Sequence, residues 1–192
     1  MMDGSEQAPA HLGARELFLA HAPFVARFLA RLGAQPADID DLVQEVFLVA
    51  HRLGGFIPDR GRATTWLAHI AVRIASNARR TRRRRPEHQD DEALTQQLSP
   101  GADPQQRAEV TESLARVNRA LAALDIDQRA VFVLFEVEGE TCEAIALGLG
   151  VPVGTVYSRL YRARKDFQQA YDRMTKERSR VPRLRQEEGA YR

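Results

Sequence analysis

Apolar residues recur at helical spacing along the N-terminal half of the chain. They form one stripe over residues 18–32, a second over 39–53 with Asp38 as its candidate N-cap, and a third over 66–75. Residues 56–64, between the second and third stripes, are rich in turn formers, and we expect a loop there. No run alternates apolar and polar residues for long enough to indicate a strand. The pattern therefore predicts an all-α fold.

A second helical block follows a change in composition. Residues 86–108 hold several prolines and mostly polar or acidic side chains, which predicts a flexible acidic linker without a core of its own. Apolar residues return at helical spacing over 114–124, and a shorter helix is expected over 131–135 with Asp127 as its N-cap. The chain is thus expected to contain two small helical domains joined by the linker.

Residues 139–165 predict two short helices joined by a tight turn. Thr141 can cap the first helix, and Gly148 and Gly150 allow the positive φ that ends it. The inward-facing residues of the second helix are Val156, Leu160 and Ala163. Its outward-facing residues are Thr155, Tyr157, Ser158, Arg159, Tyr161, Arg162 and Arg164. The pattern is typical of a helix-turn-helix, whose second helix can enter the DNA major groove. The alternative is an amphipathic helical hairpin with a solvated basic face.

Charge is informative here only through its distribution. The chain of 192 residues has 28 basic and 26 acidic residues, which leaves a net charge of +2. Six of the seven residues over 79–85 are arginine, whereas the following stretch to residue 112 is strongly acidic. A block of like charges is either a solvated arm or, where it extends a DNA-contacting helix, a phosphate-binding end of that helix.

Other classes of function find little support in the sequence. The single cysteine, Cys142, is expected on the exposed side of its helix, and a lone thiol fits a reducing cytoplasm. The five histidines show no metal-ligand spacing, and no phosphate loop or nucleophile motif is present. The N-terminal residues do not resemble a signal peptide, and no apolar run approaches the ~20 residues that span a bilayer. We expect a cytoplasmic protein that is not an enzyme and uses no cofactor or metal.

Two sets of motifs resemble those of a known family. Residues 40–47 read DDLVQEVF and residues 65–71 read TWLAHIA, and both segments are similar to motifs of bacterial sigma factors. Residues 151–164 read VPVGTVYSRLYRAR, which is similar to the helix-turn-helix motif of the same proteins. Over about residues 12–172 the chain resembles the extracytoplasmic-function group of the sigma-70 family.

The resemblance implies that successive segments of the chain have different functions. It implies a region 2-like domain over 12–85 that docks on core RNA polymerase and recognises and melts the minus-10 element. It further implies an acidic linker over 86–108, a region 4-like domain over 109–174 that recognises the minus-35 element, and a frayed tail over 175–192. The implied partners are promoter DNA, the clamp helices of the polymerase beta-prime subunit and the flap of its beta subunit. An anti-sigma factor is a candidate further partner, and no membrane insertion is expected.

The resemblance also implies three sets of site residues. The polymerase-docking set is Asp41, Gln44, Glu45 and Arg52. The minus-10 set is Phe56, Asp59, Arg60, Arg62, Arg73, Asn77, Arg80 and Arg83. In the minus-35 set the base-edge candidates are Tyr157, Ser158, Tyr161 and Arg162, and the phosphate-binding candidates are Thr155, Arg159 and Arg164. Spacing alone favours the reading of the docking set as ordinary solvent-facing residues, and the family resemblance reverses that preference. Trp66 is interpreted as a core residue rather than a stacking platform.

The chain departs from the family pattern at three places. It has Asp125-Ile126 where a proline is usual, Glu143 followed by Ala144 where an acidic pair is usual, and Tyr157 where a basic residue is common. The tyrosine at position 157 bears on which base of the minus-35 element is preferred. The alternative function is that of a stand-alone helix-turn-helix transcriptional regulator, which would devote its first block to a ligand or to dimerisation.

Overall fold

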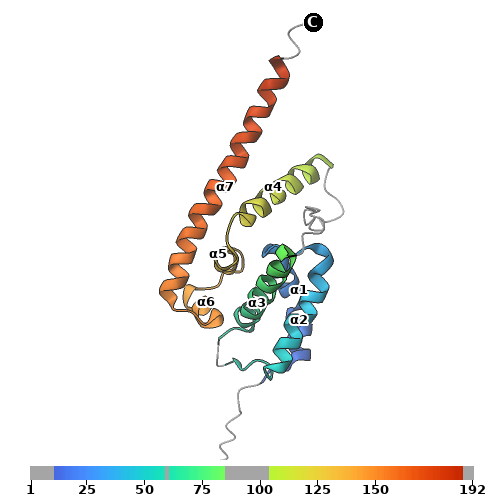
Figure 1. Ribbon diagram of the computed structural model, residues 1–192, viewed down its shortest axis with the longest axis vertical. Coiled ribbons are helices and arrows are strands. Elements are labelled where there is room, and N and C mark those ends of the chain that lie inside the picture. Colours follow the sequence, from blue (N-terminus) through green and yellow to red (C-terminus); the bar gives the residue numbers. More distant parts are fainter. Residues whose placement is uncertain (1–10, 59–60, 85–103, 188–192) are drawn as a thin grey trace, which may run out of the picture.

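The computed structural model describes residues 11–58, 61–84 and 104–187 (Figure 1). In chain order the elements are α1 (Ala14–Arg31), the 3-10 helix η1 (Pro36–Asp38), α2 (Ile39–Arg52), α3 (Ala63–Arg84), α4 (Pro104–Ala122), α5 (Ile126–Phe132), the π-helical turn η3 (Val133–Val137), α6 (Cys142–Leu149) and α7 (Val153–Glu187). The only β pairing within these ranges is an isolated antiparallel bridge between Leu12 and Phe56. The predicted all-α class is confirmed.

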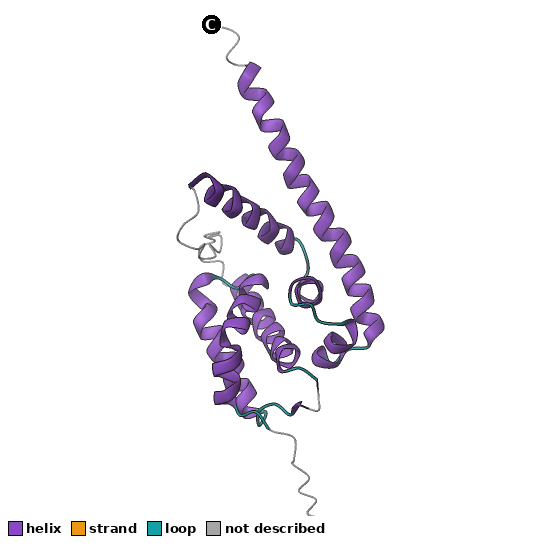
Figure 2. Cartoon of the chain, turned by 180° about the vertical axis from the view of Figure 1, so that it is seen from behind, coloured by secondary structure: helices purple, strands orange, loops and turns teal. Residues whose placement is uncertain are grey.

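The first three helices pack on one another as an N-terminal bundle (Figure 2). The buried face of α1 is formed by Leu17, Phe24, Val25, Phe28 and Leu29. Phe18, with which the predicted stripe began, is 43% exposed and lies at the edge of the bundle against Phe47. The expected helix is therefore present, but its inward face is rotated from the predicted one.

Asp38 occupies the N-cap position of α2 as predicted, whereas the predicted N-cap of α5 is wrong. The side chain of Asp38 makes no capping hydrogen bond and instead pairs with Arg82 of α3. Helix α5 is capped by Asp125, not by Asp127, because the Asp125 carboxylate accepts from the Gln128 N–H at 2.8 Å. The Gln128 side chain in turn accepts from the Asp125 N–H at 3.3 Å, which completes a capping box. The residue that replaces the usual proline thus starts the helix.

The helix-turn-helix is formed by α6 and the N-terminal part of α7. Thr141 caps α6 as predicted, since its Oγ1 accepts from the Ala144 N–H at 3.2 Å. Gly150 ends that helix with a φ of 65°. Gly148 does not have a positive φ, because it lies inside α6 and is buried. Cys142 is also buried, contrary to the expectation of an exposed thiol, and burial raises the pKa of that thiol.

The C-terminal boundaries differ from the predicted ones. Helix α4 begins at Pro104, inside the segment expected to be linker, and proline is favoured at the first position of a helix. Helix α7 continues to Glu187, through most of the expected frayed tail, and projects beyond the rest of the molecule (Figure 1). Residues 85–103, on which the prediction of a flexible linker rests, lie outside the described residues.

The two predicted domains lie in direct contact, which the sequence analysis did not anticipate. Helices α5 and α6 both pack against α3, as both ribbon views show (Figures 1 and 2). Buried apolar residues of the two parts belong to one continuous cluster, which includes Ala68 and Val72 of α3 together with Ile145 and Ala146 of α6. The two helical blocks therefore share a core.

Candidate nucleic-acid interface

The recognition helix presents its base-edge candidates to solvent. Val156, Leu160 and Ala163 of α7 are buried against the rest of the helix-turn-helix, as predicted. The opposite face carries the four candidates, all exposed: Tyr157, Ser158, Tyr161 and Arg162. Arg162 is in none of the ion pairs formed among the described residues, so its guanidinium is available to a base.

Two of the predicted phosphate-binding arginines already have partners within the protein. Arg159 donates to Asp127 of α5 at 2.8 Å. Arg164 donates to Glu136 of η3 at 2.6 Å, and its guanidinium lies 5.1 Å from the centroid of the Phe135 ring. These contacts tie α7 to the two elements that precede the helix-turn-helix. A phosphate would have to share or replace the carboxylate partner of each arginine. Thr155, the third candidate, is half-buried at the start of α7.

A hydrogen bond that the sequence analysis missed joins the two helices of the helix-turn-helix. The hydroxyl of Tyr157 donates to Oε1 of Glu143 at 3.1 Å on the exposed surface. Hydrogen bonds from its own backbone N–H and from Tyr157 lower the pKa of Glu143, while the Glu143 carboxylate raises the pKa of Tyr157. The departure at position 157 is therefore coupled to the acidic residue at position 143. The two residues lie 14 positions apart, on different helices. Helical periodicity within one helix therefore could not predict their contact.

The loop proposed for the minus-10 element is packed more tightly than expected. Phe56 is 3% exposed, pairs with Leu12 through two backbone hydrogen bonds, and lies with its ring centroid 5.6 Å from that of Trp66. Trp66 packs against the core from a partly buried position, which agrees with its interpretation as a core residue. In this conformation Phe56 has no face open to a base. Asp59 and Arg60 lie outside the described residues.

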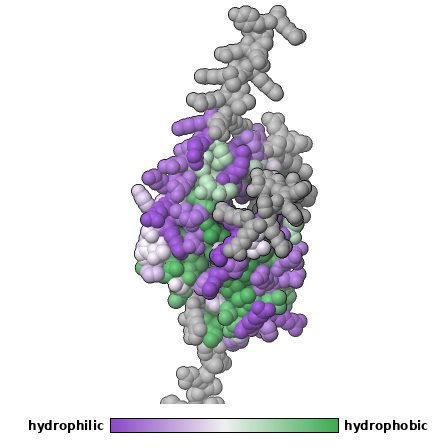
Figure 3. All heavy atoms as spheres, in the orientation of Figure 1, coloured by the Kyte–Doolittle hydropathy of each residue, from purple (hydrophilic) through white to green (hydrophobic). Residues whose placement is uncertain are grey.

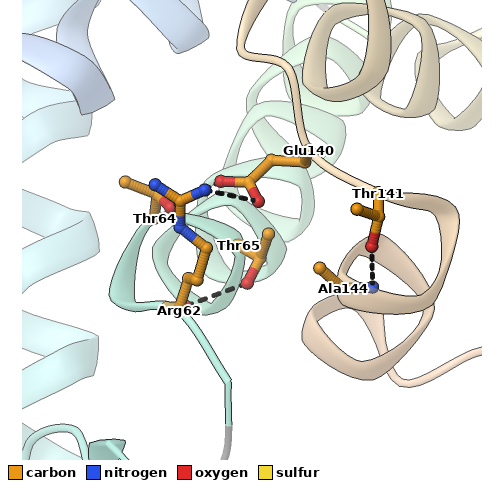
Figure 4. A network of polar contacts seen from close by, with 6 residues as sticks. All are labelled: Arg62, Thr64, Thr65, Glu140, Thr141 and Ala144. Carbon is orange, nitrogen blue, oxygen red and sulfur yellow. Dashed lines mark hydrogen bonds and ion pairs between the residues drawn. The ribbon is translucent and has the colours of Figure 1, made fainter.

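At the end of the same loop, two side chains contact the C-terminal domain. Glu140, in the connection between η3 and α6, accepts from Arg62 at 3.3 Å and from Thr64 at 3.0 Å (Figure 4). Thr65 donates to the backbone carbonyl of Arg62 at 2.9 Å, which fixes the start of α3. Arg62, a predicted minus-10 residue, is thus held at the domain interface, although its side chain is 66% exposed.

The polar face of α3 is exposed from Arg73 onward. Arg73, Asn77 and Arg80 are exposed, as a nucleic-acid surface requires. Arg83 belongs to α3, but its side chain lies outside the described set. Arg82, next to these positions, pairs with Asp38 instead of projecting freely. The exposed cations therefore form a basic edge along this helix.

The outer face of α2 contains an apolar residue among the polar docking candidates. Asp41, Gln44, Glu45 and Arg52 are all exposed, as predicted. Leu48 stands four residues after Gln44 and four before Arg52, which places the three on one helix face. It is 55% exposed. The space-filling view shows apolar surface in the half of the molecule where α2, α3 and α6 lie (Figure 3). In the sequence, Leu48 could have been recognised as a leucine that lies outside the predicted buried stripe of residues 39–53.

Two further features are absent from the described ranges. No helix there is long and apolar enough to cross a bilayer. In the same part of the chain, no three His, Cys, Asp or Glu side chains are grouped as metal ligands.

Comparisons with known proteins agree with this arrangement. Residues 17–85 match the family model described as Sigma-70 region 2, and residues 114–167 match that described as Sigma-70, region 4. The RNA polymerase sigma-H factor of Pseudomonas aeruginosa is 32% identical over 174 residues, covering 84% of this chain and 87% of that protein. The ECF RNA polymerase sigma-E factor of Escherichia coli K12 is 33% identical over 135 residues, covering 67% of this chain and 71% of that protein.

Two solved structures show the same fold. One is the sigma factor RpoE in complex with the anti-sigma factor NepR from Bartonella quintana, with a TM-score of 0.62 at 23% identity over 82% of this chain and 96% of that chain. The other is CnrH in complex with the cytosolic domain of CnrY, with a TM-score of 0.58 at 27% identity over 83% of this chain and 87% of that chain. Both regions of the family occur here in order, on helices with the expected exposed faces. The chain therefore belongs to the sigma-70 family of bacterial RNA polymerase sigma factors, in its extracytoplasmic-function group.

Proposed function

We propose that this sigma factor binds core RNA polymerase through α2 and directs it to promoters that α3 and α7 recognise. The observation that supports this most directly is the pairing, in one chain, of an exposed recognition helix with a second, separate basic helix. A stand-alone regulator needs only the first of these. The proposed activity is recruitment and promoter recognition rather than catalysis, and its site is the cytoplasm, where the polymerase works.

The outer face of α2 is the proposed polymerase-docking surface. It combines Asp41, Gln44, Glu45 and Arg52 with the exposed side chain of Leu48. An apolar centre surrounded by polar partners is the usual composition of a specific protein interface. The clamp helices of the beta-prime subunit are the proposed partner of this surface, and the flap of the beta subunit is the proposed partner of the C-terminal domain. An anti-sigma factor, as found with the two solved relatives, is a candidate further partner.

The two DNA elements are assigned to different kinds of surface. On α7, Tyr157, Ser158, Tyr161 and Arg162 would enter the major groove of the minus-35 element as base-reading residues. On α3, Arg73, Asn77 and Arg80 would follow the melted minus-10 strand, together with Arg62 at the end of the loop. Cations along a groove suit a single strand, because they track its phosphates without a requirement for sequence.

Transcription in vitro tests the proposal. Core polymerase is incubated with genomic fragments, with and without this chain, and the transcript starts are sequenced. A shared pair of elements upstream of the starts, found only when the chain is present, is the expected result. Footprints of the chain alone on the same fragments, with no dependence on core polymerase, would favour the stand-alone regulator instead.

A further inference from the structure

Helix α7 continues well beyond the part of the chain that the family model covers. The match to region 4 ends at residue 167, whereas α7 runs from Val153 to Glu187 and projects past the rest of the molecule (Figure 1). At about 1.5 Å per residue, the helix extends about 30 Å beyond residue 167. None of the site residues proposed above lies on this extension.

The first turns of the extension are packed firmly against the C-terminal domain. Phe167 stacks on Phe132 of α5 and on Tyr171, with ring centroids 4.9 and 6.1 Å apart. Ala170 is buried and Met174 is half-buried on the same side of the helix, and α4 packs against α7. Up to Met174, the extension is therefore held rigidly in line with the recognition helix.

The opposite face of the extension carries exposed cations. They are Lys165, Arg173 and Lys176, and we call them the basic stripe. Ser158 and Arg162 precede the stripe on the same face, because all five positions are separated by steps of three or four residues, with two such steps between Lys165 and Arg173. The basic stripe thus continues the base-edge face of the recognition helix along the same uninterrupted helix.

The cations of the basic stripe are available to an external anion. None of the three takes part in an ion pair formed within the described part of the chain. Arg159 and Arg164, the arginines predicted for phosphates, are already paired with carboxylates of α5 and η3. Asp172 is an exposed acid beside the stripe and accepts from Gln168 at 2.8 Å, which leaves the stripe with an excess of positive charge. A phosphate bound there displaces no internal ion pair, and the helix that presents the cations is already ordered.

Distance along the helix decides between bases and phosphates as the partner. Arg173 stands 11 residues after Arg162, which is about 16 Å along the helix axis. The major groove is about 12 Å wide, and its two edges are the phosphate backbones. A helix that places Arg162 at a base edge has therefore left the groove before it reaches Arg173. The basic stripe can meet phosphates beside the element but not the bases within it.

We propose that the basic stripe is a phosphate-binding extension of the recognition helix, which binds the duplex that flanks the minus-35 element whatever its sequence. This inference rests on the proposed function for the placement of α7 on that element. Because phosphate contacts carry no direct sequence information, the stripe contributes affinity and leaves base preference to the residues that precede it.

Two double variants of the full chain test the proposal. Arg173→Gln combined with Lys176→Gln removes two cations of the stripe, and helicity should not change, because arginine, lysine and glutamine have similar helix propensities. Arg15→Gln combined with Arg119→Gln is the matched control. It also removes two exposed cations, but from α1 and α4. A general effect of net charge on DNA binding would appear in both double variants.

The main readout is the salt dependence of binding to a promoter fragment. It is measured for the free chain and for the holoenzyme reconstituted with core polymerase. Each phosphate contact that is lost lowers the slope of log affinity against log salt concentration by ~0.9, so the stripe variant should lose ~1.8. The control should keep the wild-type slope, and neither variant should change the preferred minus-35 sequence. Asp172→Asn, which removes the acid beside the stripe, should bind the same fragment more tightly than the wild type.

An altered duplex tests whether phosphates are the partner. Methylphosphonate linkages, which carry no charge, replace the phosphates on either side of the minus-35 element. They should weaken binding of the wild type but weaken the stripe variant much less, because a contact that is already lost cannot be lost again. An equal loss in both proteins would overturn the contact between the stripe and these phosphates.

The remaining outcomes separate the basic stripe from the proposed function. A wild-type slope in the stripe variant, or an equal decrease in the control, overturns the stripe as a phosphate-binding surface. A stripe variant that loses affinity for core polymerase in the absence of DNA assigns these cations to the polymerase and also overturns it. If the wild type does not bind core polymerase but the free chains show the expected difference in slope, the stripe stands and the proposed function fails.

Discussion

Tyr157 and Glu143 are joined by a hydrogen bond of 3.1 Å that crosses from the recognition helix to the first helix of the helix-turn-helix. The tyrosine hydroxyl is the donor, and the carboxylate keeps the ring at the α6 side of the recognition face. Tyr157 stands at a position where the family resemblance led us to expect a basic residue. Instead of a free cation, this position therefore carries the Tyr157 ring, which the Glu143 carboxylate holds in place.

The first prediction follows from this pair. Tyr157→Phe and Glu143→Ala should each shift base preference at the same minus-35 position, because both release the ring. The double variant should shift it no further than either single one, since residues that act through one contact are not additive. Selection of binding sites from a randomised minus-35 duplex by the reconstituted holoenzyme measures this. Independent shifts at different positions would show that Glu143 does not orient Tyr157.

The second prediction separates two arginines of the recognition helix. Arg162→Ala should weaken minus-35 binding by ~1–3 kcal/mol and relax preference at one base, because its guanidinium is free to reach a base edge. Arg164→Ala should weaken all sequences alike, and the loss of its contacts with Glu136 and Phe135 should also lower the melting temperature. Affinities for duplexes varied one base at a time provide the measurement. A uniform loss in both variants would contradict the assignment of Arg162 to a base.

The third prediction concerns the exposed leucine on α2. Leu48→Asp should weaken association with core polymerase by ~0.8–1.6 kcal/mol, about half the range for burying a whole leucine side chain, because 55% of Leu48 is still exposed. Asp41→Arg combined with Gln44→Ala should weaken the same association while leaving helicity intact. Leu19→Asp is the matched control, because Leu19 is 72% exposed on α1. Retention of wild-type affinity by Leu48→Asp would place the docking surface elsewhere.

The fourth prediction tests the corrected N-cap of α5. Asp125→Ala should lower the free energy of unfolding by ~1 kcal/mol, because it removes the side-chain acceptor at the start of the helix. Asp127→Ala removes only an exposed ion pair with Arg159 and should cost ~0.2–1 kcal/mol. Urea unfolding followed by circular dichroism compares the two. An equal or larger loss from Asp127→Ala would restore that residue as the effective cap.

Local pattern was enough to determine the helices and several of their faces. The spacing of Val156, Leu160 and Ala163 predicted the buried side of the recognition helix. The residues between them are exposed as expected, except for Arg159, which is half-buried. Thr141 as a cap and Gly150 as a helix end also followed from neighbours in the chain. These features depend on contacts within one or two helical turns, so the sequence alone contains the information that specifies them.

Only the tertiary structure decided what the residues between the domains do. Glu140 meets Arg62 and Thr64 across 78 and 76 positions of sequence, and Gly148 meets Thr65 across a similar gap. Phe56, predicted to be available for stacking, is buried because the chain returns to Leu12 beside it. Periodicity shows which side of a helix is apolar, but not which distant surface covers it. The physical reason is that these contacts depend on how the two helical domains pack on each other. That packing does not change the spacing of apolar residues within either domain, so the sequence pattern does not reveal it.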